Sequence, residues 1–164
     1  MVTPSEPSQF DLSLLAMDSE DLSIVSAHMQ NAVVRVGEMI YIPSDQRFVL
    51  IGARYDWLSA QHNAPQRVRV GLHFDHVTRV THIGVDQTQP QLALNLQSLL
   101  FKAVQAVAGD DEHITGHILL AFEGGSTIRL DVECIEAQMR DIGPRWVSMH
   151  EPSLGVDDRP PDVL

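Results

Sequence analysis

The chain has 164 residues, a length that suits one compact domain, and its 22 acidic side chains against 11 lysines and arginines give a formal net charge of −11. This acidic balance argues against a nucleic-acid partner, because sequence-independent binding to DNA or RNA needs clustered cations. No apolar run approaches the roughly 20 residues that cross a bilayer, and the N-terminal residues resemble no secretory signal, so we expect no membrane partner.

Proline and a lack of apolar residues at both ends predict disordered tails over residues 1–10 and 150–164, the second of them acidic. A single domain is therefore expected over residues 11–149. It opens with a helix, because Asp18 suits the N-cap position and apolar residues then recur at helical spacing to about Asn31.

From Ala32 the pattern changes to the two-residue period of β-strands, and strand-like runs follow one another through most of the domain. The runs are residues 32–42, 47–57, 67–74, 77–85, a segment that starts at Leu92, 116–123 and 126–133. Turn residues at 43–46 predict a first hairpin, and Gly124-Gly125 predicts another, since glycine supplies the positive φ angles of a tight turn. Short connections between these runs indicate antiparallel pairing.

The last element is expected to be a helix from about Cys134 to Ile142, because Ile135, Met139 and Ile142 lie on one helical stripe and Gly143-Pro144 would end it. The predicted fold class is therefore α+β, with about seven mostly antiparallel strands and an N-terminal and a C-terminal helix. Two arrangements stay open. One is a pleckstrin-homology-like, partly open barrel whose C-terminal helix plugs one end, and the other is a curved sheet packed on both helices.

Three segments of the chain also carry a family resemblance, LSLLAMDSEDLSIVSAHMQNAVVRVGEMIY, RFVLIGARYDW and STIRLDVECIEAQMRDIGPRW. Over about residues 12–147 the chain resembles a small bacterial family, domain-of-unknown-function family 2948. The resemblance implies a stand-alone, single-domain cytoplasmic protein. It implies no activity and no catalytic residues.

Eight histidines suggest a metal site, and the candidates form two groups, His73, His76 and His82 in one and His113 and His117 in the other. His73 and His76 are three residues apart, so on an extended strand they face opposite sides and converge only if the chain turns between them. The run from Asp110 to His117 contains three acids and two histidines, which suits a solvated loop. We therefore predict no metal site and no cofactor.

Catalytic motifs are missing from the sequence, which contains no G-x-S-x-G, no phosphate-binding glycine loop and one lysine. Cys134 is the single cysteine, which excludes an internal disulfide and fits a reducing cytoplasm. The neighbouring Glu133 and Glu136 would raise the pKa of its thiol, so we expect a buried, inert side chain. No catalytic residue is predicted.

The binding candidates lie on two neighbouring strands and are Arg54, Asp56, Trp57, Arg67 and Arg69. Arginine, tyrosine and tryptophan dominate binding hot spots, which favours a recognition role. The competing interpretation is an ion pair within the sheet, backed by aromatic packing, in which Arg67 and Arg69 join Asp56.

Two functions follow from these patterns. The first is a non-enzymatic binding or assembly module that recognises an unknown protein or peptide, or that forms a homodimer through a sheet edge. The alternative is a small metal-dependent enzyme or ligand-binding protein that uses the clustered histidines.

Overall fold

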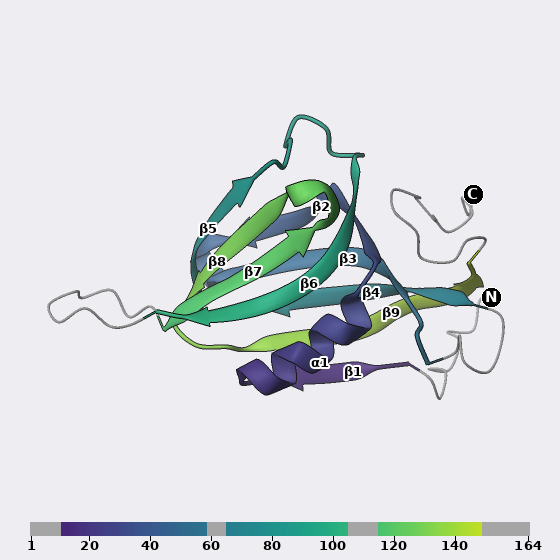
Figure 1. Cartoon of the computed structure of the whole chain (residues 1–164), viewed down its shortest axis with the longest axis horizontal. Helices are drawn as coiled ribbons and strands as arrows, with labels where there is room; N and C mark the ends of the chain where they lie inside the picture. The colour runs from purple at the N-terminus through teal and green to yellow at the C-terminus, as the bar shows by residue number, and fades with distance from the viewer. Residues whose placement is uncertain (1–10, 59–64, 105–114, 149–164) are drawn as a thin grey trace, which may run out of the picture.

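The computed structural model describes residues 11–58, 65–104 and 115–148, and in these ranges the chain forms strands with a single α-helix. In chain order the elements are β1 (Ser13–Ala16), α1 (Ser19–Met29), β2 (Ala32–Ile42), the 3-10 turn η1 (Pro43–Asp45), β3 (Arg47–Tyr55), β4 (Gln66–Phe74), β5 (Val77–Ile83), β6 (Ala93–Ala103), β7 (Gly116–Phe122), the 3-10 turn η3 (Glu123–Gly125), β8 (Thr127–Val132) and β9 (Ala137–Val147). Figure 1 shows the strands wrapped around a common interior with α1 beside them.

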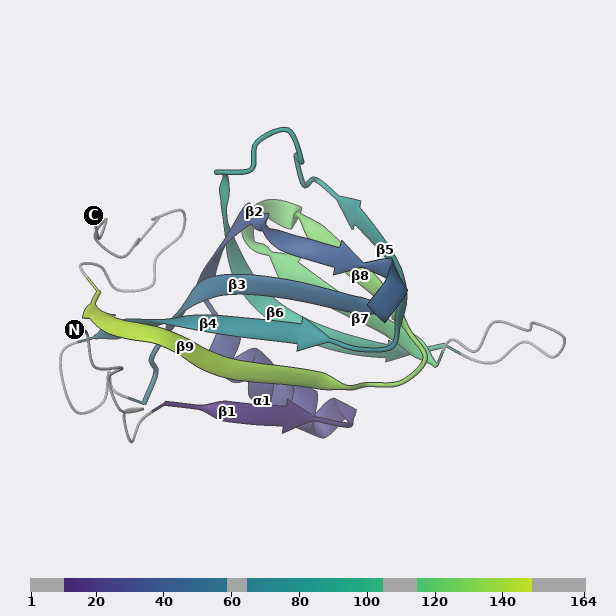
Figure 2. The same ribbon diagram turned by 180° about the vertical axis from the view of Figure 1, so that it is seen from behind.

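All nine strands belong to one antiparallel sheet in the order β1-β9-β4-β3-β2-β6-β7-β8-β5. The sheet is open, because its edge strands β1 and β5 do not pair with each other. It is nevertheless strongly curled (Figures 1 and 2), so that the start of β5 returns to the turn between β2 and β3. There the backbone N–H of Val77 donates to the carbonyl of Gln46 at 2.8 Å.

The predicted fold class is wrong in its helices and its strand number. The segment expected as the C-terminal helix is the strand β9, so no helix plugs a barrel, and the N-terminal strand β1 was not predicted. Residues of β9 alternate between the two faces, with Met139 and Asp141 buried and Arg140 and Ile142 exposed. A buried aspartate beside an exposed isoleucine hides this alternation in the sequence, and the stripe of apolar residues then suggests a helix.

The other elements follow their local sequence signals. All seven predicted strand runs are present, joined by the expected hairpins, and Gly124 and Gly125 have φ angles of 85° and 93°. The predicted first helix is α1, whose N-cap Asp18 accepts a hydrogen bond from the N–H of Asp21 at 2.8 Å. This cap satisfies one of the free N–H groups of the first turn.

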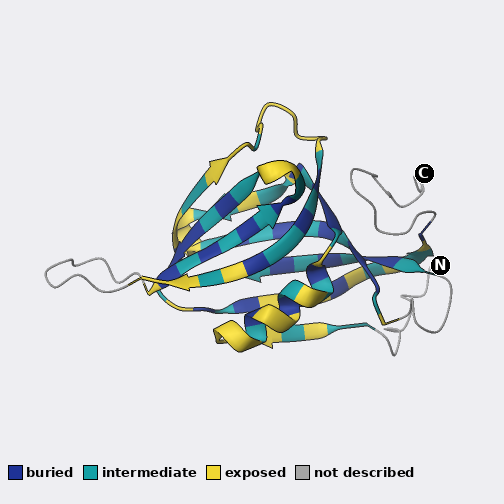
Figure 3. Cartoon of the chain, viewed as in Figure 1, coloured by how far each residue is buried: buried dark blue, intermediate teal, exposed yellow. Residues whose placement is uncertain are grey.

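The core lies on the concave side of the sheet, where α1 packs against β6 and contributes Leu22, Val25 and Met29. Strand residues alternate between buried and more exposed positions (Figure 3), as the two-residue period requires. The side-chain oxygen of Ser26 on α1 accepts a hydrogen bond from the N–H of Leu99 on β6 at 2.9 Å. Helix and sheet are therefore joined by a hydrogen bond as well as by apolar contact.

Candidate functional site

β2 and β5 each have a backbone edge that pairs with no strand in the described part of the chain. β2 pairs with β6 only over residues 32–35, and its second half pairs on the β3 side alone. β5 pairs with β8 on one side, and its other side carries no strand. We call the space between residues 38–42 of β2 and 78–83 of β5 the β2–β5 gap.

The β2–β5 gap is framed at both ends (Figure 2). At one end, the hydroxyl of Tyr41 donates to the carbonyl of Val77 at 2.8 Å, so a side chain and not a ladder joins the two strands. At the other end, the loop after β5 crosses to β2, where the N–H of Gly37 donates to the carbonyl of Pro90 at 2.8 Å. A Cβ at Gly37 would lie 2.9 Å from the Cβ of Pro90, so this crossing depends on glycine.

A cavity of about 300 Å³ occupies the gap and reaches the apolar interior of the sheet. Its lining residues are Val36, Gly37, Met39, Tyr41, Phe48, Val80, His82, Val85, Gln87, Pro90 and Ile128. Val36, Phe48 and Ile128 belong to the core and form its apolar inner part. The volume lies at the lower end of the range for small-molecule pockets.

Polar groups lie at the mouth of the cavity. His82 and Gln87 line the cavity there, and both residues are exposed. Tyr41 uses its hydroxyl on Val77, and its partial burial raises the pKa of that hydroxyl. The arrangement can take an apolar group out of water and offer it an imidazole and an amide at the entrance.

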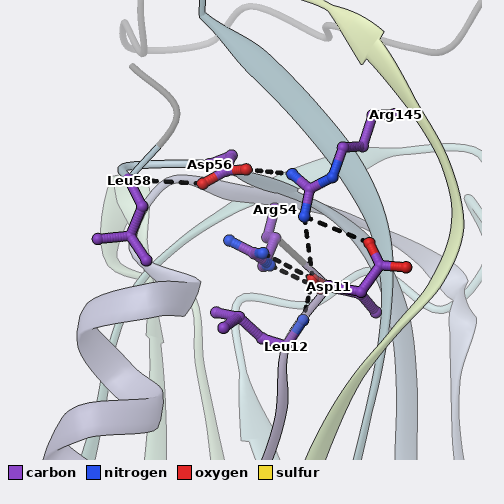
Figure 4. Close-up of polar contacts among 7 residues, drawn as sticks. Asp11, Leu12, Arg54, Asp56, Leu58 and Arg145 are labelled. Carbon is purple, nitrogen blue, oxygen red and sulfur yellow. Dashed lines mark hydrogen bonds and ion pairs between the residues drawn. The ribbon is translucent and has the colours of Figure 1, made fainter. Parts of the chain in front are cut away.

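Two of the sequence-predicted binding residues, Arg54 and Asp56, meet in an ionic network on the concave side (Figure 4). Arg54 is fully buried and donates from Nε and Nη2 to the two carboxylate oxygens of Asp141, both at 2.7 Å. Asp141 also accepts from the N–H of Leu12 at 2.8 Å, and its own N–H donates to the Leu12 carbonyl at 2.9 Å. This pair therefore attaches the residue before β1 to β9 and β3.

Arg145 extends the same network toward Asp56 and Asp11 (Figure 4). Its guanidinium contacts the carboxylate of Asp56 through Nη1 and that of Asp11 at 3.3 Å through Nη2. Asp56 further accepts from the N–H of Leu58 at 3.2 Å. Two arginines and three aspartates thus hold the ends of β3 and β9 and the start of the described chain together.

Trp57 and Arg67 contribute to a second cluster, which is organised around Tyr55. The rings of Tyr55 and Trp57 meet edge to face with centroids 4.6 Å apart, and the guanidinium of Arg67 lies 5.8 Å from the Tyr55 centroid. Arg67 donates to the carbonyls of Asn31 and Ala53 at 3.1 and 3.0 Å. The side chain of Arg69 lies farther along, 3.8 Å from that of Glu38.

The five predicted binding residues are therefore divided between separate environments. Arg54, Asp56 and Arg67 are at most 2 % exposed and are engaged in contacts within the chain. The partners differ from the expected ones, because Asp56 pairs with Arg145, and neither Arg67 nor Arg69 joins it in the described contacts. Trp57 and Arg69 keep partly exposed side chains. Their role in binding stays a prediction.

Three of the histidines in the described ranges pair with separate acidic or amide groups. His76 lies 2.6 Å from Glu136, His117 lies 2.7 Å from Asp131, and His73 lies 3.3 Å from Gln138. No three histidine, cysteine, aspartate or glutamate side chains among the described residues gather as a metal-binding group. His113 and the acids at 110–112 lie outside the described residues.

Cys134 is exposed, so the expectation of a buried side chain is wrong. Its pKa is raised, first by partial desolvation and then by Glu136 and Glu133. The predicted direction of the pKa change is thus confirmed, and the thiolate is disfavoured.

Most of the residues that line the cavity could not be predicted from the sequence. Met39, Tyr41, Val80 and His82 lie in predicted strand runs, where no local pattern marks them as binding residues. To predict this site, one would have to know that β2 and β5 both have unpaired edges and that these edges lie side by side. The sequence does not show this, because only the curl of the sheet brings the two strands together.

Comparison with known proteins gives one match. Neither a curated protein nor a solved structure matches the chain significantly. In the described part of the chain, no helix has the length and apolar character that crossing a membrane requires. The model of one family, described as a protein of unknown function (DUF2948), matches residues 12–154. Because this match spans most of the sequence, the chain belongs to the DUF2948 family.

Proposed function

We propose that this protein is a non-enzymatic binding module that recognises an extended segment of a partner protein by strand addition to β5. The observation that carries the proposal is the free edge of β5, which lies beside an apolar cavity. A free sheet edge presents a row of backbone donors and acceptors, and an added strand satisfies them while side-chain pockets provide selectivity.

β5 suits this role better than β1, the other edge of the sheet. β1 has four residues and β5 has seven, so β5 offers the longer row of backbone groups to an added strand. The cavity also adjoins β5, through Val80 and His82. A register shift between Val77 and Arg79, together with the charge of Arg79, discourages indiscriminate pairing with other strands.

The test is a selection of random nonapeptides displayed on phage against the full-length protein, followed by amide hydrogen exchange with the selected peptides. Strand addition predicts slower exchange for amides of β5 and unchanged exchange for β1. In an added strand, the amides of alternate residues point toward β5 and those between them point away. N-methylation of the first set should therefore abolish binding, whereas N-methylation of the second set should be tolerated. Failure to select a peptide, or protection away from β5, would overturn the proposal.

A further inference from the structure

The free edge of β5 and the cavity are related by the geometry of a sheet. Directly opposite residues on neighbouring strands point to the same face. Val80 and His82 both line the cavity, so their side chains lie on the concave side of β5. A residue that is added opposite either of them points its side chain to the same side, into the cavity.

The size of the cavity selects a large side chain. An apolar cavity of about 150 Å³ holds a benzene molecule. The cavity here is about 300 Å³, which leaves a small aliphatic side chain with unfilled space on several sides. A phenyl, phenol or indole ring fills more of the space and makes more contacts.

The lining excludes a charged side chain. The inner wall consists of core residues, Val36, Phe48 and Ile128, and burying an unpaired charge against them is costly. His82 and Gln87 at the mouth can bond a polar atom at the outer edge of a ring, as phenol and indole groups require.

We infer that the cavity in the β2–β5 gap is the recognition pocket for one aromatic side chain of the partner segment. The inference rests on the proposed strand addition to β5 and specifies its partner. Residues on either side of the aromatic side chain point to the opposite face, so they contribute backbone hydrogen bonds and little contact with the cavity.

The experiment compares selected peptides with variants at a single position. Changing the aromatic residue of a selected peptide to alanine should weaken binding roughly 30-fold or more, as for a central hot spot. In the protein, Met39→Trp places a large ring in the cavity and should weaken binding to a similar degree. Ile40→Trp is the matched control, because Ile40 neighbours Met39 but is 58 % exposed and does not line the cavity.

Fluorescence anisotropy with labelled peptides measures these affinities, and circular dichroism checks that each variant is folded. If Met39→Trp does not fold, Val80→Phe fills the cavity from the β5 side. Two results would refute the aromatic pocket while strand addition still held. Selected peptides would protect β5 amides but show no aromatic preference, or they would bind both cavity variants with unchanged affinity. Peptides that bind without protecting β5 amides would overturn strand addition itself.

Discussion

Asp141→Asn tests how much the buried ion pair with Arg54 stabilises the fold. Both side chains are fully buried and are joined by two hydrogen bonds of 2.7 Å. Asparagine keeps the shape of the side chain but removes its charge and replaces one acceptor by a donor. Arg54 then keeps a buried charge without a compensating carboxylate, which costs about 3–5 kcal/mol of unfolding free energy.

Urea denaturation followed by circular dichroism measures the effect. With a urea dependence of about 2 kcal/mol per molar, a loss of about 4 kcal/mol lowers the midpoint by about 2 M. Arg69→Gln is the control, since Arg69 and Glu38 lie 3.8 Å apart with both side chains partly exposed. An ion pair of that kind contributes about 0–1 kcal/mol.

A loss of unfolding free energy below about 1 kcal/mol for Asp141→Asn would refute the reasoning, because a buried arginine that lacks its carboxylate partner should destabilise the fold more strongly. The double variant Arg54→Met with Asp141→Leu separates charge from packing. Replacing both partners removes the uncompensated charge, so the double variant should be more stable than Asp141→Asn.

Three other changes test local features of the fold. Burial and the guanidinium of Arg54 lower the pKa of His28, so as pH falls the unfolded state binds a proton at His28 before the folded state does. The protein therefore loses stability as pH falls below about 6.5. His28→Gln should flatten the decline in thermal midpoint between pH 7 and pH 5.5, and an unchanged slope would contradict this. Cys134, with its raised pKa, should react with iodoacetamide at pH 7.5 more slowly than free cysteine, and equal rates would count against the effect. Gly116→Ala should cost about 1–3 kcal/mol, because its Cβ would lie 2.5 Å from the ring of Phe101, whereas Gly71→Ala meets only ordinary contacts at 3.7 Å and should be near neutral in the same denaturation assay.

Strands that pair with a neighbour in sequence could be predicted, because their signals are local. The hairpin of β2 and β3 and that of β7 and β8 follow from alternation and turn residues within a short segment. β1 and β9 could not be predicted in this way. They pair with each other across more than 100 residues, and the burial of Asp141 depends on Arg54, which lies 87 positions earlier.

The candidate site was less predictable than the fold. The residues around Arg54 were predicted to bind a partner, because arginine and aromatic side chains dominate interfaces. In the structure most of them are buried and contact other residues of the same chain. The cavity depends instead on where pairing between strands ends. Met39, Val80 and His82 carry no unusual signal in the sequence, and only the curled sheet brings them together.

β3 contributes to both the cavity in the β2–β5 gap and the ionic network around Arg54, and the distance between these two sites leads to a last prediction. Phe48 lines the cavity and Arg54 holds the ionic network, and six residues of a strand span about 20 Å. Effects at sites this far apart usually add independently. Asp141→Asn, assayed at a temperature where it remains folded, should therefore bind a selected peptide with the affinity of the unaltered protein, while Met39→Trp should lose binding without a comparable loss of stability. Loss of affinity in folded Asp141→Asn would mean that the ionic network sets the geometry of the β2–β5 gap through β3.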